Sequence, residues 1–174
     1  KRGKSFDGSA AVTNTLAGKR ILNTRAVHQS AALSDLLATH GAVPLEYPCI
    51  AIMPPDDTTD LDKALLDLNA GGYDWLVLTS TNTVAALAER LRVLNIKLSH
   101  STFQTAVIGP TTATSVHAEL GLQTFELPDE YVAESLATHI PNQLAAKVLL
   151  PISAIARPTL ADMLTARGAS VTVI

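Results

Sequence analysis

Two short apolar runs of the sequence are each followed at once by hydroxyl, amide or glycine residues that could bind an anion. The runs cover residues 75–78 and 105–108. The candidate binding residues that follow them are Thr79, Ser80, Asn82, Gly109, Thr111 and Thr112. Hydroxyl and amide groups donate hydrogen bonds, and a helix that begins beside them adds free backbone N–H groups and a partial positive charge. Such a set suits an anionic ligand.

The two apolar runs predict the strands that would position these donors. A short apolar run between polar residues is typical of a strand buried on both faces of a parallel sheet. Helical patterns follow at 84–94 and 110–119, and Pro110 suits a first helical position. Because ligands of open α/β sheets bind at the carboxyl ends of the strands, the pair of turns favours a binding edge. For either turn alone, helix capping by Ser, Thr or Asn is an equally physical explanation.

Two arginines occupy further strand-to-helix turns. Arg25 follows a predicted strand at 20–23, and Arg157 opens a predicted helix at 157–167 after the strand 147–150. A guanidinium group can hold a carboxylate through two parallel hydrogen bonds. The alternative for Arg25 is a solvated side chain or one paired with a nearby acid.

Strands and helices alternate along the chain, which predicts an α/β fold with a parallel, three-layer sheet of flavodoxin-like type. Pro44 and Pro48 interrupt the extended segment 43–52, so an edge strand or a linker is expected there. The other predicted elements are helices at 28–39, 59–69 and 131–140 and strands at 123–126 and 171–174. The side chains expected on the buried face of the first of these helices are Ala32, Leu33, Leu36 and Leu37.

Composition excludes several classes of function. The 174 residues are 47% hydrophobic and 17% charged, which suits a globular core. A net charge of −3 and an aromatic content of 4% argue against a nucleic-acid partner. With no apolar run of membrane-span length and no visible signal peptide, we expect a cytoplasmic protein without a membrane partner. Residues 1–19 are polar and aperiodic, and we interpret them as a tail or linker.

Motifs for covalent, metal or nucleotide chemistry do not occur. No histidine pair has HExxH spacing, and the nucleophile elbow, the dinucleotide fingerprint and the phosphate loop are all missing. Cys49 lies in an apolar run and is expected to be a buried structural thiol. The acidic cluster around 56–62 lacks the pattern of a calcium loop and suits the start of a helix. We therefore assign no catalytic residue, no metal site and no cofactor.

The order of the edge segments resembles that of the uroporphyrinogen-III synthase family. The resemblance extends from about Arg20 to Ile174, and it rests on the order and spacing of the segments rather than on any single one. The segments are 22–25 (LNTR), 47–52 (YPCIAI), 74–80 (DWLVLTS), 108–113 (IGPTTA) and 148–151 (VLLP), followed by Arg157, Leu160 and 168–171 (GASV).

The resemblance implies two α/β domains joined by two linker strands, the first domain being split in sequence. The implied boundaries are 20–43 for the start of domain one, 44–53 for a linker strand, 54–168 for domain two and 169–174 for the return linker strand. The family returns to domain one beyond the point that corresponds to Ile174, so we expect the 174-residue chain alone to be inactive.

The reaction implied by the resemblance is ring closure of hydroxymethylbilane, a linear tetrapyrrole with many carboxylates, with inversion of ring D and loss of water. The substrate ionises its own leaving group, so the site is expected to hold one conformer, and all eight candidate residues would donate to carboxylates. No cofactor is implied. A further hypothesis treats residues 1–18 as the end of a linker from a fused tetrapyrrole enzyme. The alternative is a non-catalytic α/β module that binds a small anion.

Overall fold

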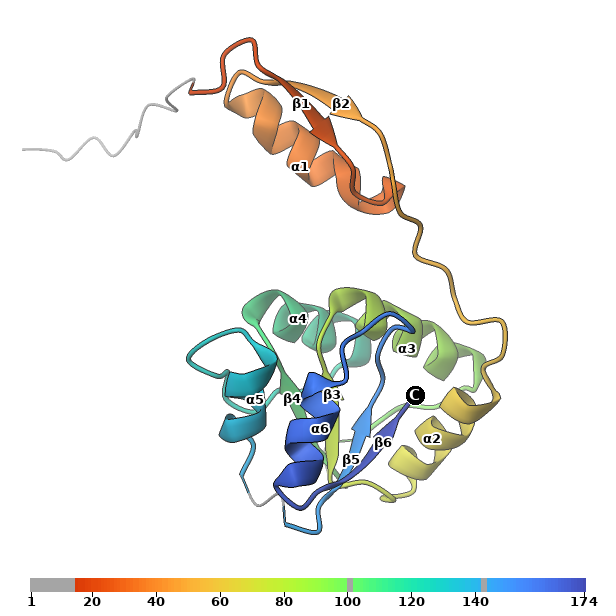
Figure 1. Cartoon of the computed structure of the whole chain (residues 1–174). Coiled ribbons are helices and arrows are strands. Elements are labelled where there is room, and N and C mark those ends of the chain that lie inside the picture. The colour runs from red at the N-terminus through yellow and green to blue at the C-terminus, as the bar shows by residue number, and fades with distance from the viewer. Residues whose placement is uncertain (1–14, 100–101, 142–143) are drawn as a thin grey trace, which may run out of the picture. The chain divides into compact units, whose positions relative to one another are not determined.

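The computed structural model describes residues 15–99, 102–141 and 144–174, and its contacts divide the chain into two compact units between Met53 and Pro54. Each unit contains a parallel β-sheet, of two strands in the first and four in the second (Figure 1). The predicted α/β class with parallel sheets is therefore confirmed. Residues 1–14 of the predicted tail lie outside the described residues, whereas Leu16 and Gly18 donate backbone hydrogen bonds to His40 and Gly41.

The first unit is a single β–α–β element. Strand β1 (Arg20–Asn23), helix α1 (Val27–Thr39) and strand β2 (Val43–Glu46) follow one another, and the two strands pair in parallel. Pro44 of β2 lies opposite Ile21 of β1. Among the described residues, β1 is the only strand paired with β2. A proline can be accommodated there because an edge strand leaves one row of its backbone groups unpaired.

The face of α1 that packs against the strands is polar, so the predicted burial of its leucine face was wrong. Ser30 and Ser34 are buried, whereas Leu36 is 56% exposed. Asn23 donates from Nδ2 to the Ser30 carbonyl (2.9 Å) and to Ser34 Oγ (3.0 Å), and Ser34 Oγ donates to Glu46 Oε1 (2.9 Å). Buried polar groups need partners, and this network supplies them from both strands. The other three residues of the predicted face are exposed or half-buried: Ala32, Leu33 and Leu37.

Cys49 is exposed, which contradicts the prediction of a buried thiol. Strand β2 ends at Glu46, and residues 47–55 belong to no helix or strand. Two backbone hydrogen bonds, from Tyr47 to Asn23 and from Cys49 to Thr24, hold the first part of this segment beside the end of β1. Among the described residues no helix covers the segment, so its apolar composition does not lead to burial.

The second unit contains four parallel strands in the order β4-β3-β5-β6 and six helical segments. The strands are β3 (Trp75–Leu78), β4 (Gln104–Val107), β5 (Lys147–Leu150) and β6 (Ser170–Val173). The helices are α2 (Thr59–Asn69), α3 (Thr81–Val93), α4 (Pro110–Ser115) with its π-helical continuation η1 (Val116–Leu120), α5 (Ala133–His139) and α6 (Thr159–Ala166). Across the described parts of the chain, none of the helices has the length and apolar character that crossing a bilayer requires.

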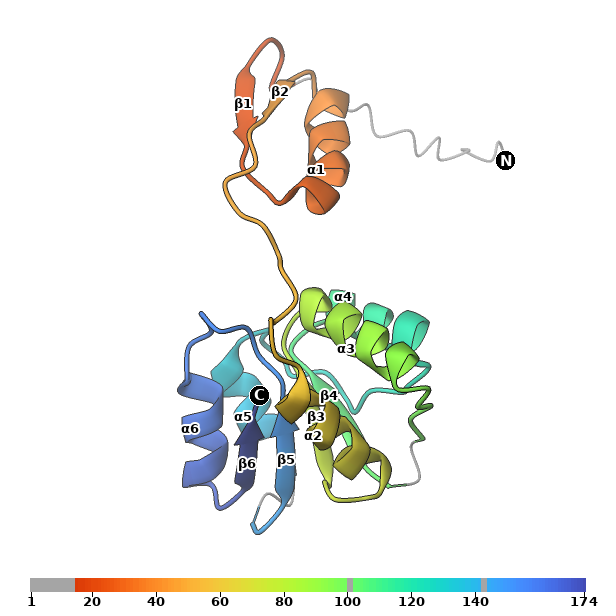
Figure 2. The same cartoon turned by 90° about the vertical axis from the view of Figure 1, so that its right-hand side faces the viewer.

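Strand β3 is buried on both faces, as its apolar sequence predicts. Leu76 and Leu78 join a cluster with α2 and α3, whereas Trp75 and Val77 join a second cluster with α5 and α6. Successive residues alternate between the clusters because strand side chains point to opposite faces. The helices therefore form two layers around the sheet, which both views show (Figures 1 and 2).

Several predicted elements differ from those observed; α3 begins at Thr81 rather than at residue 84, and α6 begins at Thr159 rather than at residue 157. Residues 123–126 form no strand; Phe125 donates one backbone hydrogen bond to Thr105 (2.7 Å), and its ring packs edge-on against Trp75 at a centroid distance of 5.5 Å. The ring contact, rather than a hydrogen-bonded ladder, holds this segment. Helix α5 begins at Ala133, two residues after its predicted start, so Tyr131 precedes the helix.

The acidic residues around α2 act at the start of the helix, as predicted. Hydrogen bonding to the side chain and then to the backbone of Thr59 lowers the pKa of Asp57, and the backbone N–H donates at 2.8 Å. Asp62 in the first turn accepts two hydrogen bonds from Arg90 of α3, at 2.6 and 2.8 Å. The Arg90 guanidinium lowers the pKa of Asp62 below its ordinary value of 3.8 and ties α2 to α3.

Candidate functional site

Three strand-to-helix turns of the second unit meet at one edge of its sheet. β3 lies between β4 and β5, and all three strands run in the same direction. Leu78 at the end of β3 pairs with Val107 at the end of β4. The turns that follow these strands therefore lie side by side at the carboxyl edge (Figure 1). Seven of the eight candidate residues lie on these turns or in the first helical turn after them: Thr79, Ser80, Asn82, Gly109, Thr111, Thr112 and Arg157.

The turn after β3 is capped by its own side chain. Ser80 is the N-cap of α3, and its Oγ accepts a hydrogen bond from the Thr83 backbone N–H (3.1 Å). The same oxygen lies 2.9 Å from Thr83 Oγ1. The capping explanation therefore applies to Ser80. Thr79 and Asn82, on either side of the cap, are half-buried.

The turn after β4 has no side-chain cap. Gly109 occupies the N-cap position of α4, and Pro110 takes the first helical position, as predicted. Thr111 is exposed, whereas Thr112 is only 7% exposed. Since no side chain caps this helix, the N–H groups of its first turn remain available to a ligand in a way that those of α3 do not. Thr112, the third residue of α4, lies in the first helical turn and can offer its backbone N–H to this edge.

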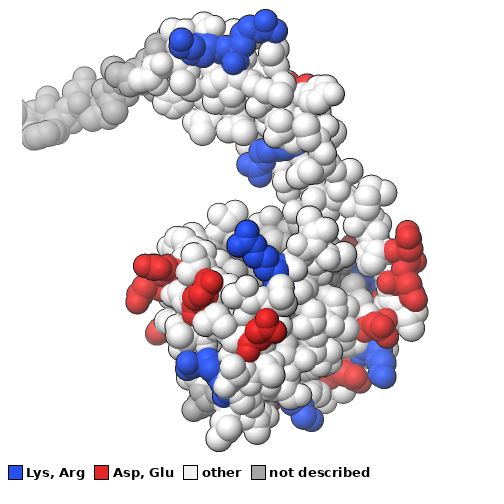
Figure 3. Space-filling view, viewed as in Figure 1, with Lys and Arg blue, Asp and Glu red and all other residues white. Residues whose placement is uncertain are grey.

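The turn after β5 contributes a cation. Arg157 is exposed in the segment between β5 and α6, and no acidic side chain of the described residues forms an ion pair with it. In contrast, Arg90 and Arg92 are both paired, with Asp62 and Glu89. Acidic and basic side chains are otherwise scattered over this face of the second unit (Figure 3). An unpaired guanidinium at the same edge of the sheet as uncapped N–H groups favours a carboxylate or phosphate ligand.

Arg25, the eighth candidate, belongs to the first unit. It is exposed at the turn after β1, and its backbone N–H donates to Asn23 Oδ1 (3.3 Å). The side chain of Asn23 thus joins the turn to α1 through Ser30 and Ser34. Asn23 is not among the residues selected from the sequence. A polar residue at the last position of a strand, where an apolar one would be expected, was the signal that could have identified it.

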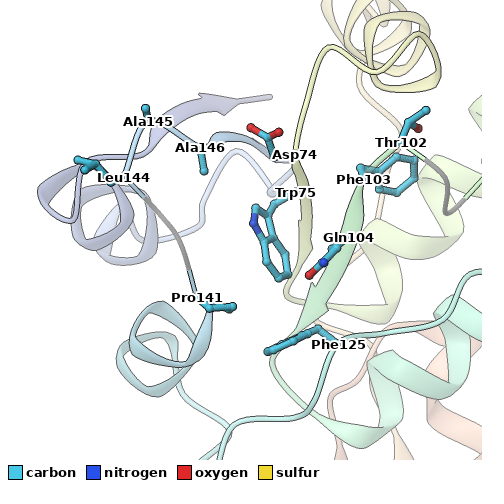
Figure 4. A pocket seen from close by; sticks show the side chains of 10 residues that line it. All are labelled: Asp74, Trp75, Thr102, Phe103, Gln104, Phe125, Pro141, Leu144, Ala145 and Ala146. Carbon is cyan, nitrogen blue, oxygen red and sulfur yellow. The ribbon is translucent and has the colours of Figure 1, made fainter.

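A cavity of about 600 Å³ lies at the amino-terminal end of the strands, away from the candidate edge. Trp75, Gln104 and Phe125 are among its lining residues, and Figure 4 shows their side chains around the hollow. It begins where β3 and β4 begin, whereas the candidate residues follow the ends of these strands. The cavity therefore lies at the amino-terminal end of the sheet, and the hydrogen-bond donors lie at its carboxyl edge. We take the edge with the donors as the candidate site.

Tyr131 is a further residue of this edge that the sequence analysis placed within a helix. A Cβ atom built on Gly109 would lie 3.4 Å from Cγ of Tyr131, so the ring packs against the glycine backbone. Tyr131 is nevertheless 58% exposed. The start of α5 at Ala133 determines this position, and the helical pattern of the sequence did not predict that start.

The candidate edge provides hydrogen-bond donors and positive charge. Its members are hydroxyls, an amide, backbone N–H groups and Arg157, with no carboxylate or imidazole among the selected residues. Within the residues that the structure describes, no three His, Cys, Asp or Glu side chains are placed to hold a metal ion. Such an edge can grip and shape a polyanion.

Comparison with known families gives a match over most of the chain. A family model described as "Uroporphyrinogen-III synthase HemD" matches residues 31–174. The uroporphyrinogen-III synthase of Synechococcus elongatus is 37% identical over 135 residues, which are 78% of this chain and 50% of that protein. The porphyrin biosynthesis protein HemD of Ruminiclostridium josui is 30% identical over 153 residues, covering 86% of this chain and 30% of that protein. The chain thus spans half or less of the length of these two relatives.

Solved structures support the fold. A mutant uroporphyrinogen III synthase from Thermus thermophilus aligns with a TM-score of 0.70 and 21% identity, over 90% of this chain and 61% of that chain. The wild-type protein of the same bacterium, in a second crystal form, aligns with a TM-score of 0.59 and 22% identity, over 90% and 60%. At this level of identity the likeness concerns the fold alone.

Proposed function

Because the chain belongs to the uroporphyrinogen-III synthase family, we propose that the full-length natural protein cyclises hydroxymethylbilane to uroporphyrinogen III, with inversion of ring D and loss of water. One observation of the structure supports the proposal above the others: three strand-to-helix turns lie side by side at a single edge of the sheet. Together they offer hydroxyls, helix N–H groups and a guanidinium to a polycarboxylate.

The hydroxyls of the edge have different proposed roles. Thr79 and Thr111 form no hydrogen bond through their hydroxyls with any described residue, and they would donate to substrate carboxylates. Ser80 is engaged as a cap and would hold the start of α3 in place. Asn82 would act from the first turn of that helix.

The backbone and the two arginines complete the proposed site. Gly109 would allow a substrate carboxylate to approach the main chain, and Thr112 would donate its N–H. Arg157 would bind a carboxylate of the substrate at the edge of the second unit. Arg25 would do the same from the first unit. All of these roles are binding roles.

In the proposed mechanism the protein contributes positioning rather than a reactive group. Hydroxymethylbilane ionises its own leaving group, and the spontaneous product is the type I isomer. A site that holds one conformer of the bound chain would favour the inverted ring D and hence the type III isomer. Because the donors are fixed by strands and helix starts, they can hold the carboxylates of one conformer without rearranging while the ring closes.

We extend the proposal to the domain organisation of the family. Residues 20–43 would open a split first domain, 54–168 would form the second, and 44–53 and 169–174 would be linker strands. The division between Met53 and Pro54 supports the first linker, whereas β6 (Ser170–Val173) pairs with β5 along its whole length and also completes the sheet. The small share of the Ruminiclostridium josui relative that the chain covers leaves room for fusion to another tetrapyrrole enzyme.

The proposal is tested by the ratio of product isomers. The full-length natural protein is mixed with freshly prepared hydroxymethylbilane, and the type I and type III uroporphyrinogens are separated after oxidation. We expect type III to predominate and to form faster than type I forms in buffer. We expect the 174-residue chain alone to leave the buffer ratio unchanged. Saturable binding by the full-length protein with a buffer-like isomer ratio would instead identify a non-catalytic anion-binding module.

Replacement of Arg157 tests the assignment of the site. Arg157→Gln in the full-length protein should raise KM for hydroxymethylbilane about tenfold, because a charge-assisted hydrogen bond to a carboxylate contributes about 1.5–3 kcal/mol. Arg92→Gln is the matched control, since Arg92 lies at the opposite end of α3 and is exposed. Equal KM values for the two variants would remove Arg157 from the site.

A further inference from the structure

We propose that the ring of Tyr131 is an aromatic wall of the carboxyl edge, against which a pyrrole ring of the substrate stacks. This inference rests on the proposed function and adds to it a residue that contacts the carbon framework of the substrate rather than its carboxylates. Three features of Tyr131 support the proposal: its position, its contact with Gly109 and its exposure.

The position of Tyr131 follows from where its neighbours lie. It precedes α5 by two residues, and its ring lies against Gly109, which is the N-cap of α4 at the end of β4. The built Cβ of Gly109 would be 3.4 Å from Cγ, 3.6 Å from Cβ and 3.7 Å from Cδ1 of Tyr131. A ligand that approaches the uncapped N–H groups of α4 therefore also approaches this ring.

The packing places the ring beside position 109. A Cβ added to Gly109 would meet the ring at 3.4–3.7 Å, which are ordinary van der Waals contact distances. The ring therefore has a neighbour on one side without being buried. The φ angle of Gly109 is −156°, an extended value that any residue adopts, so the backbone conformation does not require glycine.

The exposure leaves the remainder of the ring available. Tyr131 is 58% exposed, and none of the described residues forms a hydrogen bond with its hydroxyl. The exposed tyrosine stands beside the first turn of α4, whereas the core aromatic residue Trp75 of the same unit is buried. An aromatic ring held at a donor-rich edge offers a flat surface to a planar ring, at a favourable offset or edge-on geometry.

The chemistry of the substrate makes such a surface useful. The donors of the edge bind carboxylates, which are attached to flexible side chains and fix the orientation of a pyrrole only weakly. Stacking acts on the pyrrole itself and restricts its rotation about the bonds to its neighbours. A wall of this kind would therefore hold one ring of the linear tetrapyrrole while the other end closes on it.

The test measures KM and kcat for hydroxymethylbilane in the full-length protein. Tyr131→Ala should raise KM about tenfold, equivalent to about 1.4 kcal/mol, with a smaller change in kcat. Tyr131→Phe keeps the ring and should remain within about twofold of wild type. Leu144→Ala is the control, because it also removes an exposed apolar side chain but lies near the opposite end of the strands and should change neither parameter.

Two outcomes with an active wild-type protein would overturn the inference. A Tyr131→Ala variant with wild-type KM and kcat would show that the ring does not touch the substrate. A Tyr131→Phe variant as impaired as Tyr131→Ala would assign the effect to the hydroxyl instead of the ring. An unchanged unfolding transition, followed by Trp75 fluorescence, shows that a raised KM does not arise from misfolding. Failure of the wild-type protein to produce the type III isomer would reject the proposed function itself, and the inference with it.

Discussion

In the second unit, helices cover both faces of the sheet with leucine and valine side chains, whereas in the first unit α1 faces its strands with Ser30 and Ser34. Leu65 and Leu76 are fully buried in the second unit. In the first, the Asn23 side chain donates to Ser30 and Ser34 of α1 and accepts from the Arg25 backbone N–H. Apolar burial is non-directional and stabilises a whole layer, while a hydrogen-bond network fixes particular atoms.

The two units therefore position their strand-to-helix turns in different ways. The second unit positions its three turns by strand register, which a buried core maintains as a whole. In the first unit, one amide side chain links the turn after β1 to α1. Loss of one core residue should therefore weaken the second unit globally, and loss of one polar residue should loosen the first unit locally. Three further measurements test that contrast, in order of decreasing effect.

The largest effect is expected from Leu65→Ala in α2. Leu65 is 0% exposed, and its truncation should cost about 2–5 kcal/mol of unfolding free energy through lost burial and a residual cavity. Leu66→Ala is the matched control, because this neighbour is 53% exposed and should change stability by less than about 0.5 kcal/mol. Urea unfolding followed by fluorescence of Trp75, the single tryptophan of the chain, reports on this unit. Equal losses of unfolding free energy in the two variants would contradict the assignment of Leu65 to an apolar core.

A smaller effect is expected from Asn23→Ala in the first unit. The substitution leaves the Ser30 carbonyl and Ser34 Oγ without their donor, at a cost of about 1–3 kcal/mol. Hydrogen exchange of α1 amides should accelerate by about tenfold or more, while the exchange of the second unit stays unchanged. Thr24→Ala, an exposed neighbour, is the control. If exchange in α1 is the same in both variants, the polar network does not hold the helix.

The smallest effect is expected from Asp62→Asn, which removes the pair with Arg90. Arg90 lowers the folded-state pKa of Asp62, so the carboxylate stabilises the fold above its ordinary pKa of 3.8 and this contribution is lost as the pH falls. The variant should melt slightly below wild type at pH 7, and the difference should shrink toward about pH 3. Glu89→Gln, from the more exposed pair with Arg92, should have less effect at pH 7. A difference in melting temperature that grows as the pH falls would contradict a stabilising role for the ionised Asp62 carboxylate.

The candidate edge could be predicted from the sequence because strand and helix patterns are local. The run 75–78 alternates between two cores, and Leu61, Leu65 and Leu68 of α2 face inward. Gly109 is the N-cap of α4, and Pro110 is its first residue. The parallel order of the strands then brings the turns together, as expected for an α/β chain. The assignment of individual donors within the edge stays a prediction.

The errors arose where packing, and not local pattern, decides the outcome. Leu36 has helical spacing suited to burial, but Asn23 and Glu46 draw the serine face of α1 onto the strands. Cys49 lies in an apolar run, but no helix or sheet of the described residues covers it, and it is exposed. Tyr131 fits a helical pattern, yet α5 starts later and leaves the ring on Gly109.

The sequence by itself determined the α/β class, the parallel strands and the absence of motifs for nucleotide or covalent chemistry, because these depend on periodicity and on residue types at short spacing. Capping was one of the explanations that the local sequence offered for the turn at Ser80, and the structure shows the cap formed. The tertiary structure alone decided that Thr112 is buried and that Tyr131 lies beside Gly109. Burial and this contact depend on segments distant in sequence and on the solvent that packing excludes, so neither is encoded in a local pattern.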